Sequence, residues 1–348
     1  MRHLRTRSLG ATSKATALAL AVLAGGTAYG VTAASATTGT TTPSTVTSAA
    51  TQSGQVGLGE LRTTQSGQAG LGALRAPSGE AEARRRLRAL EATFKGRIGA
   101  YAIDTATGKT IGYRANERFP LLSTFKAMAC AAVQHKARAS DPGLMDRVVR
   151  WTQAEVKENS PVTEKHVEDG LTVAQLCEAA ITRSDNTAGN MVLKQIGGPK
   201  GMTRYFRTLK DPISRLDRWE TELNDWSPKE KRDTTTPAWM ARDLRKVTLG
   251  NALTAQDRVR LEGWLRANQT GGERIRAGLP KSWIIGDKTG SSGSYGAAND
   301  IAVIRTSPTA APLVMTIYTN HKAADAPYDS KIVADTATIL AHALGKLP

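Results

Sequence analysis

The chain has 348 residues, of which 40% are hydrophobic and 22% are charged, and its formal net charge is +16 at pH 7. This length exceeds one average domain and is ample for a large buried core. The excess of basic residues would suit an anionic partner, but no nucleic-acid module and no basic strip interleaved with aromatic residues accompanies it. The charge therefore favours solubility over nucleic-acid binding.

The first 36 residues have the three-part pattern of a secretory signal peptide. Four basic residues come before or at the edge of an apolar stretch over residues 15–23, and small residues follow as far as Ala34-Ser35-Ala36. The apolar stretch is shorter than the roughly 20 residues of a transmembrane helix, and no second run approaches that length. We therefore expect a secreted protein without stable membrane insertion.

Residues 37–80 are rich in Thr, Ser, Gly, Gln and Ala and contain almost no large apolar side chain. Such a segment buries too little surface to offset the entropy of ordering itself, which predicts a disordered low-complexity leader. Residues 51–62 recur in similar form as residues 64–75. Two copies are too few for stacked repeats, so a duplicated spacer is favoured over a motif that docks a partner.

The remaining residues, 81–348, predict one folded domain with strands at both ends and helices between them. An amphipathic helix around Leu87 precedes a hairpin whose strands span residues 97–104 and 109–113. Near the C-terminus, three strands and a last helix are expected over residues 282–289, 298–305, 312–319 and 330–344. Helices are expected in the middle over residues 124–137, 173–182 and 186–196.

This order of elements predicts an α/β fold of the α+β type. An antiparallel sheet would be flanked by the terminal helices, and an all-helical lobe would be inserted into it. The sheet lobe would comprise residues 81–120 and 268–348, and the helical lobe would comprise residues 121–267.

A serine and a lysine lie three residues apart at the start of a predicted helix. Ser123 precedes the apolar stretch 124–137, and Lys126 lies one turn further along the same face. Backbone N–H groups at a helix N-terminus favour developing negative charge, and a nearby nitrogen base activates a serine as a nucleophile. Alternatively, Ser123 is only a helix N-cap, and the spacing by itself arises by chance in many chains.

Two further motifs follow in chain order. Ser184-Asp185-Asn186 falls in a loop between two predicted helices, and Lys288-Thr289-Gly290 ends a predicted strand, with Ser291 next. An Asp or Asn at the first site could simply cap the next helix. Glu220-Thr221-Glu222-Leu223-Asn224 lies between these two motifs. The ordered set is far rarer than any one of its parts.

Together these motifs resemble those of the class A serine β-lactamases, from about Ala81 to the C-terminus. The resemblance implies the serine β-lactamase/DD-peptidase fold and hydrolysis of β-lactams through an acyl enzyme. It also implies a loop held by an ion pair between Arg218 and Asp233. Catalytic roles are implied for Ser123, Lys126, Ser184 and Glu220. Substrate-binding roles are implied for Asn186, Asn224, Lys288, Thr289, Gly290 and Ser291.

Two departures from the family pattern bear on substrate recognition. Many members have an Arg on the strand after the third motif, where this chain has Gly296-Ala297-Ala298. The resemblance to actinobacterial members implies that Arg274 replaces it at the substrate carboxylate, the alternative being a surface charge. Asn159 stands where several relatives have an aromatic residue at the rim of the cleft. The sequence does not decide the relative activity of the enzyme on penicillins, cephalosporins and carbapenems.

Cys130 and Cys177 are the only cysteines. They lie seven residues after Ser123 and seven before Ser184, where some members of the family carry a disulfide. An even number of cysteines in an exported protein permits a bridge, and two buried thiols are an equal alternative.

The five histidines are scattered without metal-binding spacing, and no cofactor motif occurs. We therefore expect no metal and no cofactor. The resemblance implies a β-lactamase whose partner is a small β-lactam, most readily a penicillin, and a monomer is the default expectation. Two alternatives are a peptidoglycan DD-peptidase of the penicillin-binding type and a sensor that is acylated without turnover. Glu220 favours the hydrolase over the first, and the lack of a transmembrane run counts against the second.

Overall fold

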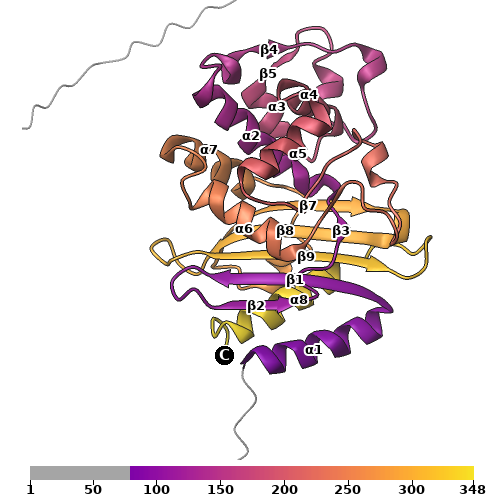
Figure 1. The fold of residues 1–348 in the computed structure, drawn as a ribbon, viewed down its shortest axis with the longest axis vertical. Helices are drawn as coiled ribbons and strands as arrows, with labels where there is room; N and C mark the ends of the chain where they lie inside the picture. Colours follow the sequence, from indigo (N-terminus) through magenta and orange to yellow (C-terminus); the bar gives the residue numbers. More distant parts are fainter. Residues whose placement is uncertain (1–78) are drawn as a thin grey trace, which may run out of the picture. The chain divides into compact units, whose positions relative to one another are not determined.

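The computed structural model describes residues 79–348 (Figure 1). The predicted signal peptide lies outside the described residues, as does the predicted leader up to residue 78. Helix α1 (Gly79–Phe94) begins two residues inside the predicted leader, because Leu87 and Ala83 on its inner face are buried against the sheet. Within the described part, none of the helices combines the length and the apolar character needed to cross a membrane.

A five-stranded antiparallel sheet forms the centre of the fold, with strand order β2-β1-β9-β8-β7 (Figure 1). The predicted hairpin and the three predicted C-terminal strands are all present in this sheet. The strands are β1 (Gly96–Asp104), β2 (Thr110–Tyr113), β7 (Ile284–Ser292), β8 (Ala297–Arg305) and β9 (Leu313–His321). The prediction that the third motif ends its strand is wrong. Ser291 and Ser292 still pair with Ala298 and Ala297 of β8, so backbone hydrogen bonding carries β7 past Gly290.

Helices cover both faces of this sheet. α1 and α8 (Ser330–Ala343) pack on one face, and α6 (Pro237–Thr248) and α7 (Ala255–Arg266) pack on the other (Figure 1). α8 presents Val333, Ala337 and Leu340 to the core at helical spacing, which explains its predicted amphipathic pattern. The predicted helical lobe, residues 121–267, includes α6 and α7, but in the structure these two helices pack on the sheet.

The predicted central helices are confirmed as α2 (Phe125–Ala139), α3 (Val173–Thr182) and α4 (Asn186–Gln195), which α5 (Gly198–Thr208) follows. α2 is buried on nearly all sides, as its alanine-rich sequence permits. Gly197 adopts a φ of 85° between α4 and α5, a conformation that glycine reaches without steric cost. The fold class is confirmed.

Short elements connect these helices. They are too short to show a periodic pattern of apolar residues, so the sequence does not predict them. Two small sheets pair β3 (Phe119–Pro120) with β6 (Thr234–Thr235) and β4 (Val148–Val149) with β5 (Leu171–Thr172). Short 3-10 helices occupy Leu122–Thr124, Leu144–Asp146, Gln153–Glu155, Thr163–Lys165, Glu222–Asn224, Ile275–Gly278 and Ser294–Gly296.

The two cysteines are adjacent but not bridged. Both are buried free thiols, and the Cys130 sulfur donates to the backbone carbonyl of Cys177 at 3.7 Å. Burial raises the pKa of the Cys177 thiol well above its usual value, which keeps it protonated. Of the two alternatives, the structure contains the pair of buried thiols, and the possible disulfide is absent.

Candidate active site

Ser123 lies in the 3-10 turn directly before α2, and its neighbour Lys126 is in the first turn of that helix. Lys126 Nζ donates to Ser123 Oγ at 2.9 Å and is completely buried. The N-cap interpretation of Ser123 is wrong, because Thr124 holds the cap position of α2 and Ser123 Oγ donates instead to Glu220 Oε1 at 3.2 Å. The hydroxyl therefore accepts a hydrogen bond from Lys126 and donates one to Glu220.

Glu220 completes a triangle with these two residues. Its Oε1 lies 3.0 Å from Lys126 Nζ, and its Oε2 accepts a hydrogen bond from Asn224 Nδ2 at 2.8 Å. Both charged side chains are fully buried. Burial lowers the pKa of Lys126, which raises the neutral fraction of its amine near pH 7. A neutral amine is the form that can take a proton from a serine hydroxyl.

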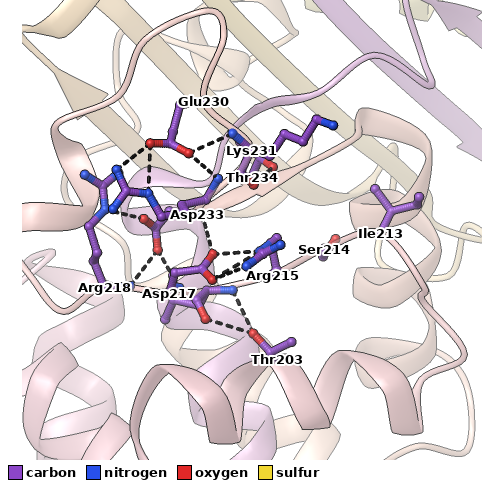
Figure 2. Close-up of polar contacts among 12 residues, drawn as sticks. Thr203, Ile213, Ser214, Arg215, Asp217, Arg218, Glu230, Lys231, Asp233 and Thr234 are labelled. Atoms are coloured by element: carbon purple, nitrogen blue, oxygen red, sulfur yellow. Dashed lines mark hydrogen bonds and ion pairs between the residues drawn. The ribbon is translucent and has the colours of Figure 1, made fainter.

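The loop that carries Glu220 is closed at its base by a polar network (Figure 2). The buried carboxylate of Asp233 accepts from the backbone N–H groups of Asp217 and Arg218, at 2.7 and 2.9 Å. Arg218 Nε also pairs with Asp233 at 2.6 Å, so the predicted ion pair is confirmed. In return, the Asp217 carboxylate accepts from the backbone N–H of Asp233. These bonds hold the two ends of the loop together.

The second motif lies opposite, between α3 and α4. Lys288 Nζ donates to Ser184 Oγ at 2.9 Å, and Lys126 Nζ donates to Asn186 Oδ1 at 2.6 Å. Asp185 caps α4 and accepts from the backbone of Val162 and Thr163, which supports a structural role for it. The motif therefore connects the serine–lysine pair with the third motif.

Strand β7 forms the other wall. Lys288 is fully buried, and burial together with the nearby charge of Lys126 holds the pKa of Lys288 well below its usual value. A Cβ atom on Gly290 would lie 2.9 Å from Leu122 Cβ and 3.2 Å from the backbone nitrogen of Ser123. Glycine at this position thus lets the strand approach the backbone of the serine turn.

Arg274 is not a surface charge, so that alternative is wrong. Its side chain is buried, and its guanidinium donates to the carbonyl oxygens of Gly290 and Asn299, each at 2.7 Å. It also donates to Ser291 Oγ at 2.5 Å. The arginine reaches β7 from the segment before the 3-10 turn at 275–278, whereas Gly296-Ala297-Ala298 spans the end of the 3-10 turn at 294–296 and the start of β8.

These residues surround one cavity of about 440 Å³. Asn159, expected at the rim, lines it, and Lys126, Glu220 and Lys288 lie buried behind its wall. The predicted residues that line it directly are Ser123, Ser184, Asn186, Asn224, Arg274, Thr289, Gly290 and Ser291. Among residues 79–348, no group of three or more His, Cys, Asp or Glu side chains could hold a metal ion.

A family model described as "Beta-lactamase enzyme family" matches residues 82–344, which is most of the chain. The chain belongs to the β-lactamase family. Beta-lactamase AST-1 of Nocardia asteroides is 49% identical to it over 265 residues, covering 76% of this chain and 84% of that protein.

Solved structures assign the class. The crystal structure of a β-lactamase from Streptosporangium roseum is 73% identical, with a TM-score of 0.76, and covers 77% of this chain and 100% of that chain. The structure of a class A β-lactamase described as that of the last common ancestor of Gram-negative bacteria is 46% identical, with a TM-score of 0.72, and the match covers 75% of this chain and 99% of that chain. This protein is a class A serine β-lactamase, an enzyme of antibiotic resistance that hydrolyses β-lactams.

Sequence reasoning missed Asn190, which positions Glu220, and it missed Thr270, Glu273, Tyr328 and Ser330 in the lining of the cavity. The Glu220 backbone N–H donates to Asn190 Oδ1 at 2.9 Å, and Asn190 Nδ2 donates to the Glu220 carbonyl at 2.8 Å. The side chain thus fixes both backbone polar groups of Glu220 from α4. Asn190 lies four residues after Asn186 on the same helix face, and this spacing was the available signal.

Replacing Asn190 with alanine is expected to slow turnover of benzylpenicillin by about 10- to 100-fold, since a misplacement of about 1 Å in a catalytic group costs that much. A pre-steady-state burst should accompany the loss if Glu220 serves deacylation. The exposed Asn116 provides the matched control, Asn116→Ala, which should keep wild-type kinetics. Wild-type kcat in Asn190→Ala would contradict a positioning role.

Proposed function

We propose that this class A β-lactamase hydrolyses penicillins most readily, and some cephalosporins, through an acyl enzyme on Ser123 that a Glu220-activated water hydrolyses. The main support for this proposal is the set of contacts that the Glu220 carboxylate makes. One carboxylate oxygen lies beside Ser123 Oγ and Lys126 Nζ, and the other accepts a hydrogen bond from Asn224. A water bound between Glu220 and Asn224 would be within reach of an ester on Ser123.

In acylation, Ser123 Oγ attacks the lactam carbonyl, and its proton passes to the Lys126–Glu220 pair. The backbone N–H groups of Ser123 and Ser291 would bind the oxyanion that develops, a kind of stabilisation worth about 10²- to 10³-fold per donor in rate. As the C–N bond breaks, Ser184 would give a proton to the departing nitrogen. The hydrogen bond that Lys288 Nζ donates to Ser184 Oγ supports this role, because Lys288 can replace the proton that Ser184 gives up.

In deacylation, Glu220 would remove a proton from the water as the water attacks the ester carbonyl, and Ser123 Oγ would then leave and regain a proton. Substrate would be held by its carboxylate and by its side chain. Arg274 and Thr289, which line the cavity, would supply a positive charge and a hydroxyl for the carboxylate, with Lys288 buried behind them. Asn186 would supply an amide for the side chain.

We also propose that the enzyme acts outside the cell as a monomer. The support for export is the charged, apolar and small-residue pattern of residues 1–36.

Steady-state hydrolysis of benzylpenicillin and a chromogenic cephalosporin by residues 37–348, with intact-mass analysis during turnover, tests the proposal. Rapid turnover of both with only a fleeting adduct is the expected result. A stoichiometric burst with a stable adduct, together with cleavage of a D-Ala-D-Ala peptide, would favour the DD-peptidase alternative.

A further inference from the structure

A second, larger cavity of about 840 Å³ adjoins the active-site cavity. It lies between the segment 272–277 and the first turn of α8. Glu273, Tyr328 and Ser330 line both cavities, so the two spaces meet at these side chains. Their common wall is on the side of the active site where Arg274 lies.

Tyr328 is the main feature of this wall. It is a large apolar side chain, yet it is 53% exposed. The centre of its ring lies 5.7 Å from Cζ of Arg274, and Nε of Arg274 donates to Ser330 Oγ at 3.3 Å. The Arg274 guanidinium lies over one face of this ring, so the exposed part of the ring is what a group entering the second cavity could contact.

The second cavity is also acidic. Its lining includes the carboxylates of Glu273, Asp329 and Asp335 and one lysine, Lys331. The Lys331 ammonium is paired with Asp335 at 2.6 Å. No further lysine or arginine lines this cavity, but Arg274 in the common wall lies close enough to Glu273 to offset part of its charge, which leaves Asp329 without a balancing lysine or arginine among the lining residues. The cavity therefore favours a cationic occupant.

We propose that this cavity is a subsite for a positively charged aromatic substituent of cephalosporins, carried on the ring carbon next to the one that bears the carboxylate. The proposal rests on the proposed function, in which Arg274 and Thr289 bind that carboxylate. A substituent on the neighbouring ring carbon then projects past Arg274 toward Tyr328 and Glu273. The tyrosine face would contribute a cation–π interaction, and the two carboxylates would contribute charge attraction.

The test uses two cephalosporins with the same thienylacetyl side chain. One carries a pyridiniummethyl group at that ring carbon, and the other carries a neutral acetoxymethyl group. The readout is the ratio of kcat/KM for the cationic substrate to kcat/KM for the neutral one. Because both substrates are measured on one preparation, a loss of folded protein cancels in the ratio.

Tyr328→Leu is expected to lower this ratio by about fivefold, the size of a cation–π contact of about 1 kcal/mol. Glu273→Gln is expected to lower it by a similar factor, because it removes one of the two carboxylate charges that attract the cation. Asp325→Asn is the matched control. Asp325 is an exposed acid of the same connecting segment that does not line the cavity, so its removal should leave the ratio unchanged. An unchanged ratio in both Tyr328→Leu and Glu273→Gln, or an equal loss for both substrates, would overturn the subsite.

The variant Arg274→Ala tests the proposed carboxylate contact independently of the subsite. All three substrates, benzylpenicillin included, carry the carboxylate, so KM should rise for all of them. If Arg274→Ala spares all three, the proposed carboxylate contact fails. The ratio in Tyr328→Leu then still reports on the subsite by itself.

Discussion

Replacing Glu220 with glutamine is expected to lower kcat for benzylpenicillin by about 10³-fold, the contribution of a well-placed general base. Glutamine has nearly the same shape and keeps the two backbone bonds to Asn190, so the loop should stay in place. It cannot accept a proton from water. Intact-mass analysis should therefore show the enzyme accumulating with one substrate mass attached at Ser123.

Glu222→Gln is the matched control in the same loop. The Glu222 side chain is 56% exposed and pairs only loosely with Lys157, at 3.5 Å, so turnover should match the wild type. Unchanged kcat in Glu220→Gln would contradict the proposed mechanism. Loss of turnover without an adduct would instead assign Glu220 to acylation, a step in which its 3.2 Å contact with Ser123 Oγ would act directly.

The second large effect is on the stability of the protein. It comes from two buried acidic residues that lie outside the active-site motifs. Asp243 on α6 and Asp211 are both fully buried. Within residues 79–348, neither carboxylate oxygen of Asp243 has a hydrogen-bond donor as partner, and Lys246 Nζ is 4.0 Å away. Burial, and then the neighbouring Asp211 carboxylate, raise the pKa of Asp243 to about 9.

A carboxyl group whose folded pKa lies above its unfolded value keeps a proton that the unfolded chain loses. The free energy of unfolding therefore falls as pH rises from about 4 to about 9, and the full cost is present above that range. Asp243→Asn removes the titrating group and can donate its amide to Asp211. It should stabilise the protein by on the order of 3 kcal/mol at pH 8 and by little at pH 4.

Urea unfolding of both proteins at several pH values measures this difference. Asp146→Asn, an exposed acid-to-amide change, should show no pH-dependent gain. A gain for Asp243→Asn that stays constant from pH 4 to pH 9 would show that the carboxyl does not titrate as described. Catalysis should be unaffected in either variant at pH 7.

Much of the site was predictable because its residues come in short local motifs. The helix after Ser123 places Lys126 within reach by helical geometry alone, at 2.9 Å. The Arg218–Asp233 pair and the positions of Ser184 and Lys288 also followed from motif order and family resemblance. The strands and long helices were predictable because each has a regular apolar pattern.

Contacts between distant segments could not be predicted in this way. Asn190 holds Glu220 across thirty positions of the chain, and nothing in the motif that contains Glu220 indicates which distant side chain fixes its backbone. The two-residue strands β3 and β6 have no period to detect, and the extension of β7 past Gly290 depends on pairing with β8.

Sequence by itself determined the class of enzyme and predicted the residues of its candidate site, because chemistry of this kind needs particular side chains at particular local spacings. Tertiary structure alone decided between the alternatives at Arg274 and at the cysteines, and it alone placed Tyr328 between two cavities. The physical reason is that burial, pairing and cavity walls are properties of several chain segments at once. The residues next to a given position in the sequence do not indicate which distant segment will pack against it.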